Sequence, residues 1–92
     1  MARVQVKYFT VLREITGKRE EVMEAETIRE LLDLLISKYG KPLQDEVNSD
    51  REKIPGYYNI LVNGLNVRLL KNLETSLKDG YVISILPPVG GG

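Results

Sequence analysis

Cysteine and histidine are both absent from this chain of 92 residues. Without cysteine the chain can form no disulfide, no thiolate nucleophile and no thiolate-bound metal site. Without histidine it lacks the usual general base near neutral pH and the commonest metal ligand. A self-sufficient hydrolase, redox enzyme or zinc protein is hard to build from what remains, so we expect this chain to bind no metal or cofactor of its own.

Aromatic residues are also scarce, and the formal net charge is zero. Tryptophan is absent and phenylalanine occurs once, so the core has to be mainly aliphatic. Thirteen basic residues balance thirteen acidic ones, which does not favour a nucleic-acid or membrane partner. The apolar runs are too short to span a bilayer, and residues 1–6 alternate like a strand and lack the apolar stretch of a signal peptide. We therefore expect one small cytoplasmic domain.

Carboxylate pairs are still available for acid–base chemistry. Glu20 and Glu21 are adjacent and follow Lys18 and Arg19. Because charged side chains prefer the surface, we interpret this stretch as a solvated strand edge and not as a catalytic pair.

Residues 3–9 show the alternation of a half-buried strand. One face carries Val4, Val6 and Tyr8, and the other carries Arg3, Gln5, Lys7 and Phe9. A turn at residues 16–18 leads to a second, more polar strand, in which Val22 is the strongest apolar candidate and Met23 lies beside it. The charges of this strand suggest an edge or a solvated face.

A helix is predicted over residues 28–39. Thr27 and Glu30 fit a capping box, in which the threonine hydroxyl accepts from the Glu30 N–H and the glutamate reaches back. Gly40 is placed to end the helix and Pro42 to block its continuation. The apolar stripe that would face the core consists of Ile28, Leu31, Leu32, Leu35 and Tyr39. Residues 41–56 are predicted to be a loop with one helical turn near residues 43–47, and we assign this loop no function.

The second half of the chain predicts three further strands, over residues 58–62, 65–68 and 81–86. Asn63-Gly64 is a tight-turn signal, since both residues accept positive φ. One helix can cover only one face of a mixed sheet, so the expected class is α+β. The element order is that of the ubiquitin-like β-grasp, a sheet of four to five strands on one main helix, with the first and last strands parallel and adjacent at its centre.

Residues 1–86 would then form the domain and residues 87–92 a tail that reads Pro87-Pro88-Val89-Gly90-Gly91-Gly92. Glycine has no Cβ and fits a narrow channel, while the prolines stiffen the point where the tail leaves the domain. One interpretation is a frayed terminus. The other is a reactive end, in which the Gly92 carboxylate is the group that a partner modifies.

Several segments together resemble the molybdopterin synthase small subunit and its archaeal relatives, ubiquitin-like sulfur carriers of the MoaD/ThiS superfamily. These segments are Tyr8-Phe9, residues 12–17, residues 61–64, residues 77–80 and residues 85–92. The resemblance covers nearly the whole chain, with residues 41–56 the poorest part, and the ending is its most specific element. Gly90 departs from the Ala, Ser or Thr that is frequent there, and Leu86 departs from a frequent aromatic residue.

The resemblance implies a mechanism that this chain does not catalyse alone. An E1-like adenylating enzyme would use ATP to adenylate the Gly92 carboxylate, and sulfur transfer would then give a thiocarboxylate. The molybdopterin synthase large subunit would receive this end, with Gly90 and Gly91 supplying reach, and the sulfur would pass to a pterin precursor.

A docking surface is expected near the root of the tail. If the first and last strands are parallel neighbours, Phe9 and Leu86 both end on the outward face, and Pro87, Pro88 and Val89 follow. This pair could contact a partner, or it could cap the sheet or pack under the loop at 41–56.

Two other functions remain open from the sequence. The first is a ubiquitin-like protein modifier that forms an isopeptide between Gly92 and a target lysine. The second is a β-grasp binding module with an inert tail.

Overall fold

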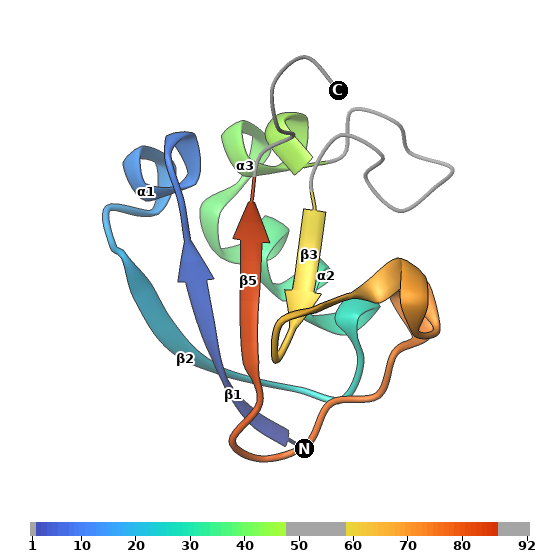
Figure 1. The fold of residues 1–92 in the computed structure, drawn as a ribbon. Coiled ribbons are helices and arrows are strands. Elements are labelled where there is room, and N and C mark those ends of the chain that lie inside the picture. Colours follow the sequence, from blue (N-terminus) through green and yellow to red (C-terminus); the bar gives the residue numbers. More distant parts are fainter. Residues whose placement is uncertain (1, 48–58, 87–92) are drawn as a thin grey trace.

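The computed structural model describes residues 2–47 and 59–86, which form a mixed sheet with helices packed against it (Figure 1). The sheet has five strands in the order β2-β1-β5-β3-β4. The strands are β1 (Ala2–Tyr8), β2 (Glu20–Ala25), β3 (Asn59–Val62), β4 (Leu65–Asn66) and β5 (Val82–Leu86). The helices are α1 (Val11–Thr16), α2 (Ile28–Tyr39) and α3 (Lys41–Val47), with short 3-10 turns η1 (Val67–Leu69) and η2 (Asn72–Glu74).

The two central strands are the first and the last in the sequence. β1 pairs with β5 in parallel, with Val6 opposite Ile83 and Tyr8 opposite Ile85. β2 and β3 flank them in antiparallel pairing. The predicted β-grasp topology is therefore confirmed.

The core lies between the sheet and α2, which packs behind the sheet in the view of Figure 1. The predicted alternation of the first strand is confirmed, because Val4, Val6 and Tyr8 are all buried. The apolar stripe of α2 meets them, with Ile28, Leu31, Leu32 and Leu35 buried and Tyr39 packed against the core. Ile83 and Ile85 of β5 complete the centre.

The ends of α2 follow the sequence signals closely. The Thr27 hydroxyl accepts from the Glu30 N–H at 3.2 Å. The Glu30 carboxylate accepts from the N–H of Glu26 at 2.6 Å, one residue before the partner that a capping box predicts. Gly40 ends the helix with φ 77° and donates its N–H to the Ile36 carbonyl at 2.7 Å.

The helix α1 was not expected from the sequence. It is six residues long, too short for a helical repeat to stand out beside the neighbouring strand pattern. Leu12 is its buried anchor, and Gly17 ends it in the left-handed region at φ 74°.

The expected loop at residues 41–56 was wrong at its start. The chain forms α3 over Lys41–Val47, which is longer than the single turn predicted near residues 43–47. Pro42 occupies its second position, where a missing N–H costs no helical hydrogen bond, and Leu43 is fully buried. Residues 48–58 lie outside the described part of the chain.

In the second strand the apolar residue that turns toward the core is Met23 and not Val22, the strongest candidate from the sequence. Val22 is 55% exposed, while Met23 packs against the core. The reason is the register, which pairs Met23 with the inward-facing Val4 of β1.

Asn63 and Gly64 both have positive φ, which confirms the predicted tight turn. β4 ends at Asn66 and not near residue 68, because the Asn66 side chain accepts from the Arg68 N–H at 2.9 Å and starts the turn η1.

Candidate functional site

The end of the sheet at which β5 finishes is the site that the sequence pointed to. Leu86 is the last residue of β5 and pairs with Asn59 at the start of β3. In Figure 1 this end of β5 lies on the same side of the molecule as α1 and α3, opposite the start of β1. The predicted tail residues Pro87, Pro88, Val89, Gly90, Gly91 and Gly92 lie outside the described residues.

Phe9 and Leu86 meet this end from neighbouring strands. Tyr8 is opposite Ile85 in the parallel pair, so Phe9 and Leu86 each follow one position later. Both side chains are half-buried, and neither belongs to the strongly exposed apolar residues of the described chain. The structure thus brings the predicted pair to one end of the sheet.

Arg13 is a residue of this region that the sequence reasoning missed. Its guanidinium carbon lies 5.2 Å from the centre of the Phe9 ring, a cation–π arrangement. Its Nε donates to the Tyr8 carbonyl at 3.0 Å, so the side chain is held against the end of β1. The short helix α1 supplies this arginine, and because that helix was not expected, no spacing argument could have placed Arg13 over Phe9.

Thr10 holds the turn between β1 and α1 in a strained conformation. Its φ is 48° and its ψ is −119°, a region that β-branched residues rarely occupy. The hydroxyl donates to the Phe9 carbonyl at 2.8 Å, and the Leu12 N–H donates to the same carbonyl at 3.1 Å. The backbone on both sides of Phe9 is therefore fixed by local contacts.

Glu21 forms a second polar cluster, between β2, β1 and α2. Its carboxylate accepts from the Tyr8 hydroxyl, from the Tyr39 hydroxyl at 2.5 Å, from Lys38 Nζ at 2.6 Å and from Lys18 Nζ at 3.2 Å. Its side chain is only 8% exposed. The interpretation of Glu20-Glu21 as a solvated edge was therefore wrong for Glu21, which turns inward opposite Val6, and holds for the exposed Glu20.

The charge state of this cluster follows from its contacts. Burial alone would raise the pKa of Glu21, but hydrogen bonds from Lys38, Tyr39, Tyr8 and Lys18 outweigh it and lower the pKa to about 2. Burial, followed by the hydrogen bond to Glu21, raises the pKa of Tyr8 far above its usual range. The hydrogen bond to Glu21 also raises the pKa of Lys38. A carboxylate that stays ionised with four donors around it joins three elements and is poorly suited to act as a general base.

Within residues 2–47 and 59–86 no group of three Asp or Glu residues is arranged to hold a metal ion. Among the same residues no helix is long and apolar enough to cross a membrane.

Three comparisons with known proteins, by family model, by sequence and by structure, find related proteins along nearly the whole chain. The model of the ThiS family matches residues 6–92. The solution structure of small archaeal modifier protein 1 from Methanosarcina acetivorans is 42% identical, with a TM-score of 0.83 over 100% of this chain and 98% of that chain. Small archaeal modifier protein 3 of Haloferax volcanii is 32% identical over 97% of this chain and 98% of its own length. Sulfur carrier protein CysO of Mycobacterium tuberculosis is 33% identical over the same shares.

Proposed function

Because this chain belongs to the ThiS family, we propose that it is a sulfur carrier whose Gly92 carboxylate is adenylated by an E1-like enzyme and converted to a thiocarboxylate. The name of its relative CysO, a sulfur carrier protein, supports the carrier role. The absence of Cys and His from the sequence fits the same division of labour. The thiol and the general base that this chemistry requires have to come from a partner.

The proposed reaction has two steps. First, a Gly92 carboxylate oxygen attacks the α-phosphorus of ATP, and pyrophosphate leaves. Second, a sulfur nucleophile at the oxidation level of sulfide attacks the acyl carbon of the mixed anhydride, and AMP leaves with the bonding electron pair. This nucleophile is hydrosulfide or a sulfide-level sulfur atom that a partner delivers. Glycine suits this role because an end without Cβ can enter the narrow channel of an adenylating enzyme.

One observation of the fold carries the proposal furthest. The parallel pairing of β1 with β5 ends the last strand beside Phe9, which Arg13 covers. A partner that draws in residues after Leu86 would meet this apolar and cationic surface first. We therefore propose Phe9, Leu86 and the following residues Pro87, Pro88 and Val89 as the docking contacts.

The proposal also names a final acceptor for the sulfur. The resemblance of residues 85–92 to the ending of molybdopterin synthase small subunits favours a pterin precursor, held in the large subunit of that enzyme. The product would be the dithiolene of a molybdenum or tungsten cofactor.

A second candidate function is protein modification. Two relatives carry the name small archaeal modifier protein, at 42% and 32% identity. In that role Gly92 would form an isopeptide with a target lysine after the same adenylation. Both functions require the Gly92 carboxylate, and they differ in the nucleophile that displaces AMP.

The test is to purify the chain with the E1-like enzyme of its own organism, supply ATP and a sulfur donor, and measure the mass of the C-terminus. A sulfur-for-oxygen exchange at Gly92 supports the carrier, and lysine adducts in a lysate support the modifier. Deleting Gly91 and Gly92 should abolish both products. If the truncated chain still performed the full cellular function of the intact chain, the binding module with an inert tail would be favoured.

The docking contacts need a separate test. Phe9→Ala and Leu86→Ala should each weaken binding to the E1-like enzyme. Leu69→Ala is the matched control, because Leu69 is 74% exposed in the η1 turn and belongs to no proposed contact. Unchanged affinity in the first two variants would reject the docking surface without rejecting the carrier function.

A further inference from the structure

The outer edge of β2 is the longest strand edge that the described residues leave without a neighbour. The sheet begins with β2 and ends with β4, which has only two residues before the chain turns into η1. β2 has six residues and pairs on one side only, with β1. In Figure 1 no described element covers this side of β2. Open edges of this length are templates for another strand.

The register shows which backbone groups point outward. The Tyr8 N–H donates to the Arg19 carbonyl at 2.9 Å, while the Gln5 N–H donates in the other direction, to Tyr81. Even-numbered residues of β1 therefore exchange hydrogen bonds with β2, and their partners are Glu21, Met23 and Ala25. The N–H and C=O groups of Glu20, Val22 and Glu24 consequently point away from β1.

The side chains of the same three residues all lie on the solvent face of the sheet. Glu20 and Glu24 are exposed, and Val22 between them is 55% exposed. An incoming antiparallel strand would place its own side chains directly opposite these three, where cross-strand pairs interact. The edge therefore presents an acidic, an apolar and again an acidic position at a spacing of two residues.

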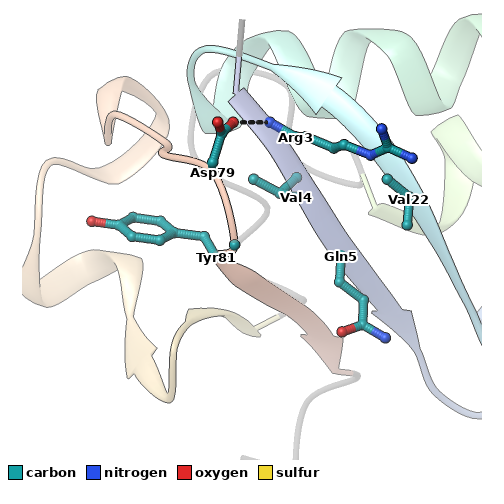
Figure 2. Close-up of a pocket in the computed structure, with 7 residues that line it drawn as sticks. Arg3, Val4, Gln5, Val22, Asp79 and Tyr81 are labelled. Atoms are coloured by element: carbon teal, nitrogen blue, oxygen red, sulfur yellow. Dashed lines mark hydrogen bonds between the residues drawn. The ribbon is translucent and has the colours of Figure 1, made fainter.

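The face next to Val22 is hollowed. A depression of about 370 Å³ lies over β1, between Val22 and the turn at Asp79 and Gly80. Figure 2 shows the Arg3 side chain reaching from β1 toward β2 beside Val22, while the Tyr81 ring points away from β1 and β2. Val22 is the β2 residue at the rim of this depression, so an apolar side chain placed opposite Val22 on the outer edge would pack against that rim and not enter the depression.

Charge excludes one occupant and favours another. A second copy paired antiparallel about Val22 would put Glu20 opposite Glu24 twice, and like charges directly opposite destabilise a sheet. A strand with lysine or arginine at these two positions meets carboxylates instead. On β1 these carboxylates lie opposite Lys7 and Arg3, but among the described residues neither pair forms an ion pair.

We propose that the β2 edge binds an extended basic strand of a partner protein, with an apolar residue opposite Val22 and Lys or Arg opposite Glu20 and Glu24. The main-chain hydrogen bonds supply affinity and the alternate side chains supply specificity. β2 lies two strand spacings, roughly 10 Å, from β5. This surface therefore uses none of the residues proposed to contact a partner at the tail, and it does not depend on the sulfur-carrier function.

The test uses a synthetic peptide with the core Lys-Thr-Val-Thr-Lys, titrated into the isotope-labelled full chain and followed by amide NMR. The proposal expects shifts centred on the amides of Glu20, Val22 and Glu24 and slower hydrogen exchange at Val22. A peptide with Glu in place of both Lys should bind roughly tenfold more weakly, the size expected when two favourable cross-strand pairs become repulsive. The double variant E20K/E24K should reverse this preference.

Two further probes separate strand pairing from simple charge attraction. Val22→Pro removes an N–H that points away from β1, so the native ladder stays intact while peptide binding is lost, and Val22→Ala is the control that keeps this donor. A peptide N-methylated at its valine makes the same test without changing the protein. Equal binding of the Lys and Glu peptides, unchanged binding of the methylated peptide, or shifts away from β2 would each overturn the proposal, as would concentration-dependent dimerisation through β2.

Discussion

Replacing Glu21 with Gln tests the polar cluster that joins β2 to β1 and α2. The substitution keeps the shape of the side chain and removes the charge that two lysines and two tyrosines surround. The pKa of Glu21 falls from an ordinary value of 4.5 to about 2 in the folded chain. Converted at ~1.4 kcal/mol per pKa unit, this difference stabilises the folded state by about 3 kcal/mol at neutral pH.

The pH dependence of this contribution has a definite sign. A carboxyl group with a depressed folded-state pKa stabilises the fold above its unfolded value, and the stabilisation is lost as the pH falls through the folded value. For Glu21 the stabilisation is complete above about pH 5, is reduced by about 2 kcal/mol at pH 3, and is nearly gone close to pH 2. The wild-type chain should therefore lose its advantage over Glu21→Gln as the solution is acidified.

Urea unfolding followed by circular dichroism, at several pH values between 7 and 3, measures this difference directly. We expect Glu21→Gln to be less stable by about 3 kcal/mol at pH 7 and by only about 1 kcal/mol at pH 3. Glu20→Gln is the matched control, since Glu20 is exposed on the other face of β2, and it should change stability by less than about 0.5 kcal/mol at every pH. A Glu21→Gln difference that stays constant with pH would refute the reasoning.

Two further substitutions test the backbone and the core. Thr10→Gly should raise the free energy of unfolding by about 1 kcal/mol, because glycine adopts a φ of 48° with a ψ of −119° without strain. This gain is the net effect after the greater conformational entropy of glycine in the unfolded chain is subtracted. A loss of stability would show that Thr10 is not strained. Leu35→Ala should cost about 2–5 kcal/mol in urea unfolding, because Leu35 is fully buried against the sheet. Leu34→Ala, at a position 37% exposed, should cost less than about 1 kcal/mol, and equal losses would contradict the assigned faces of α2.

The sequence was sufficient for the main architecture wherever a local pattern repeated. The alternation at Val4, Val6 and Tyr8 and the helical stripe from Ile28 to Tyr39 each marked a buried face that the structure confirms. Asn63-Gly64 marked its turn because few other residues accept positive φ at two successive positions.

The features that sequence reasoning missed depend on contacts between distant residues. Val22 and Met23 are both apolar, and only the pairing of Met23 with Val4 decides which of them turns inward. Glu21 looked like a surface charge because its donors come from β1, from α2 and from the turn before β2. Two of them, Lys38 and Tyr39, lie 17 and 18 residues away in the sequence. Arg13 reaches Phe9 through a helix of six residues, too short to carry a clear periodic signal.

The mass of the C-terminus after reaction with the E1-like enzyme, ATP and a sulfur donor tests the central proposal most directly. The account predicts that the intact chain gains the mass difference between sulfur and oxygen, that fragmentation places this change on Gly92, and that omitting ATP prevents it. A Gly92 that keeps its carboxylate mass under these conditions, while the same enzyme converts another sulfur carrier, would contradict the account.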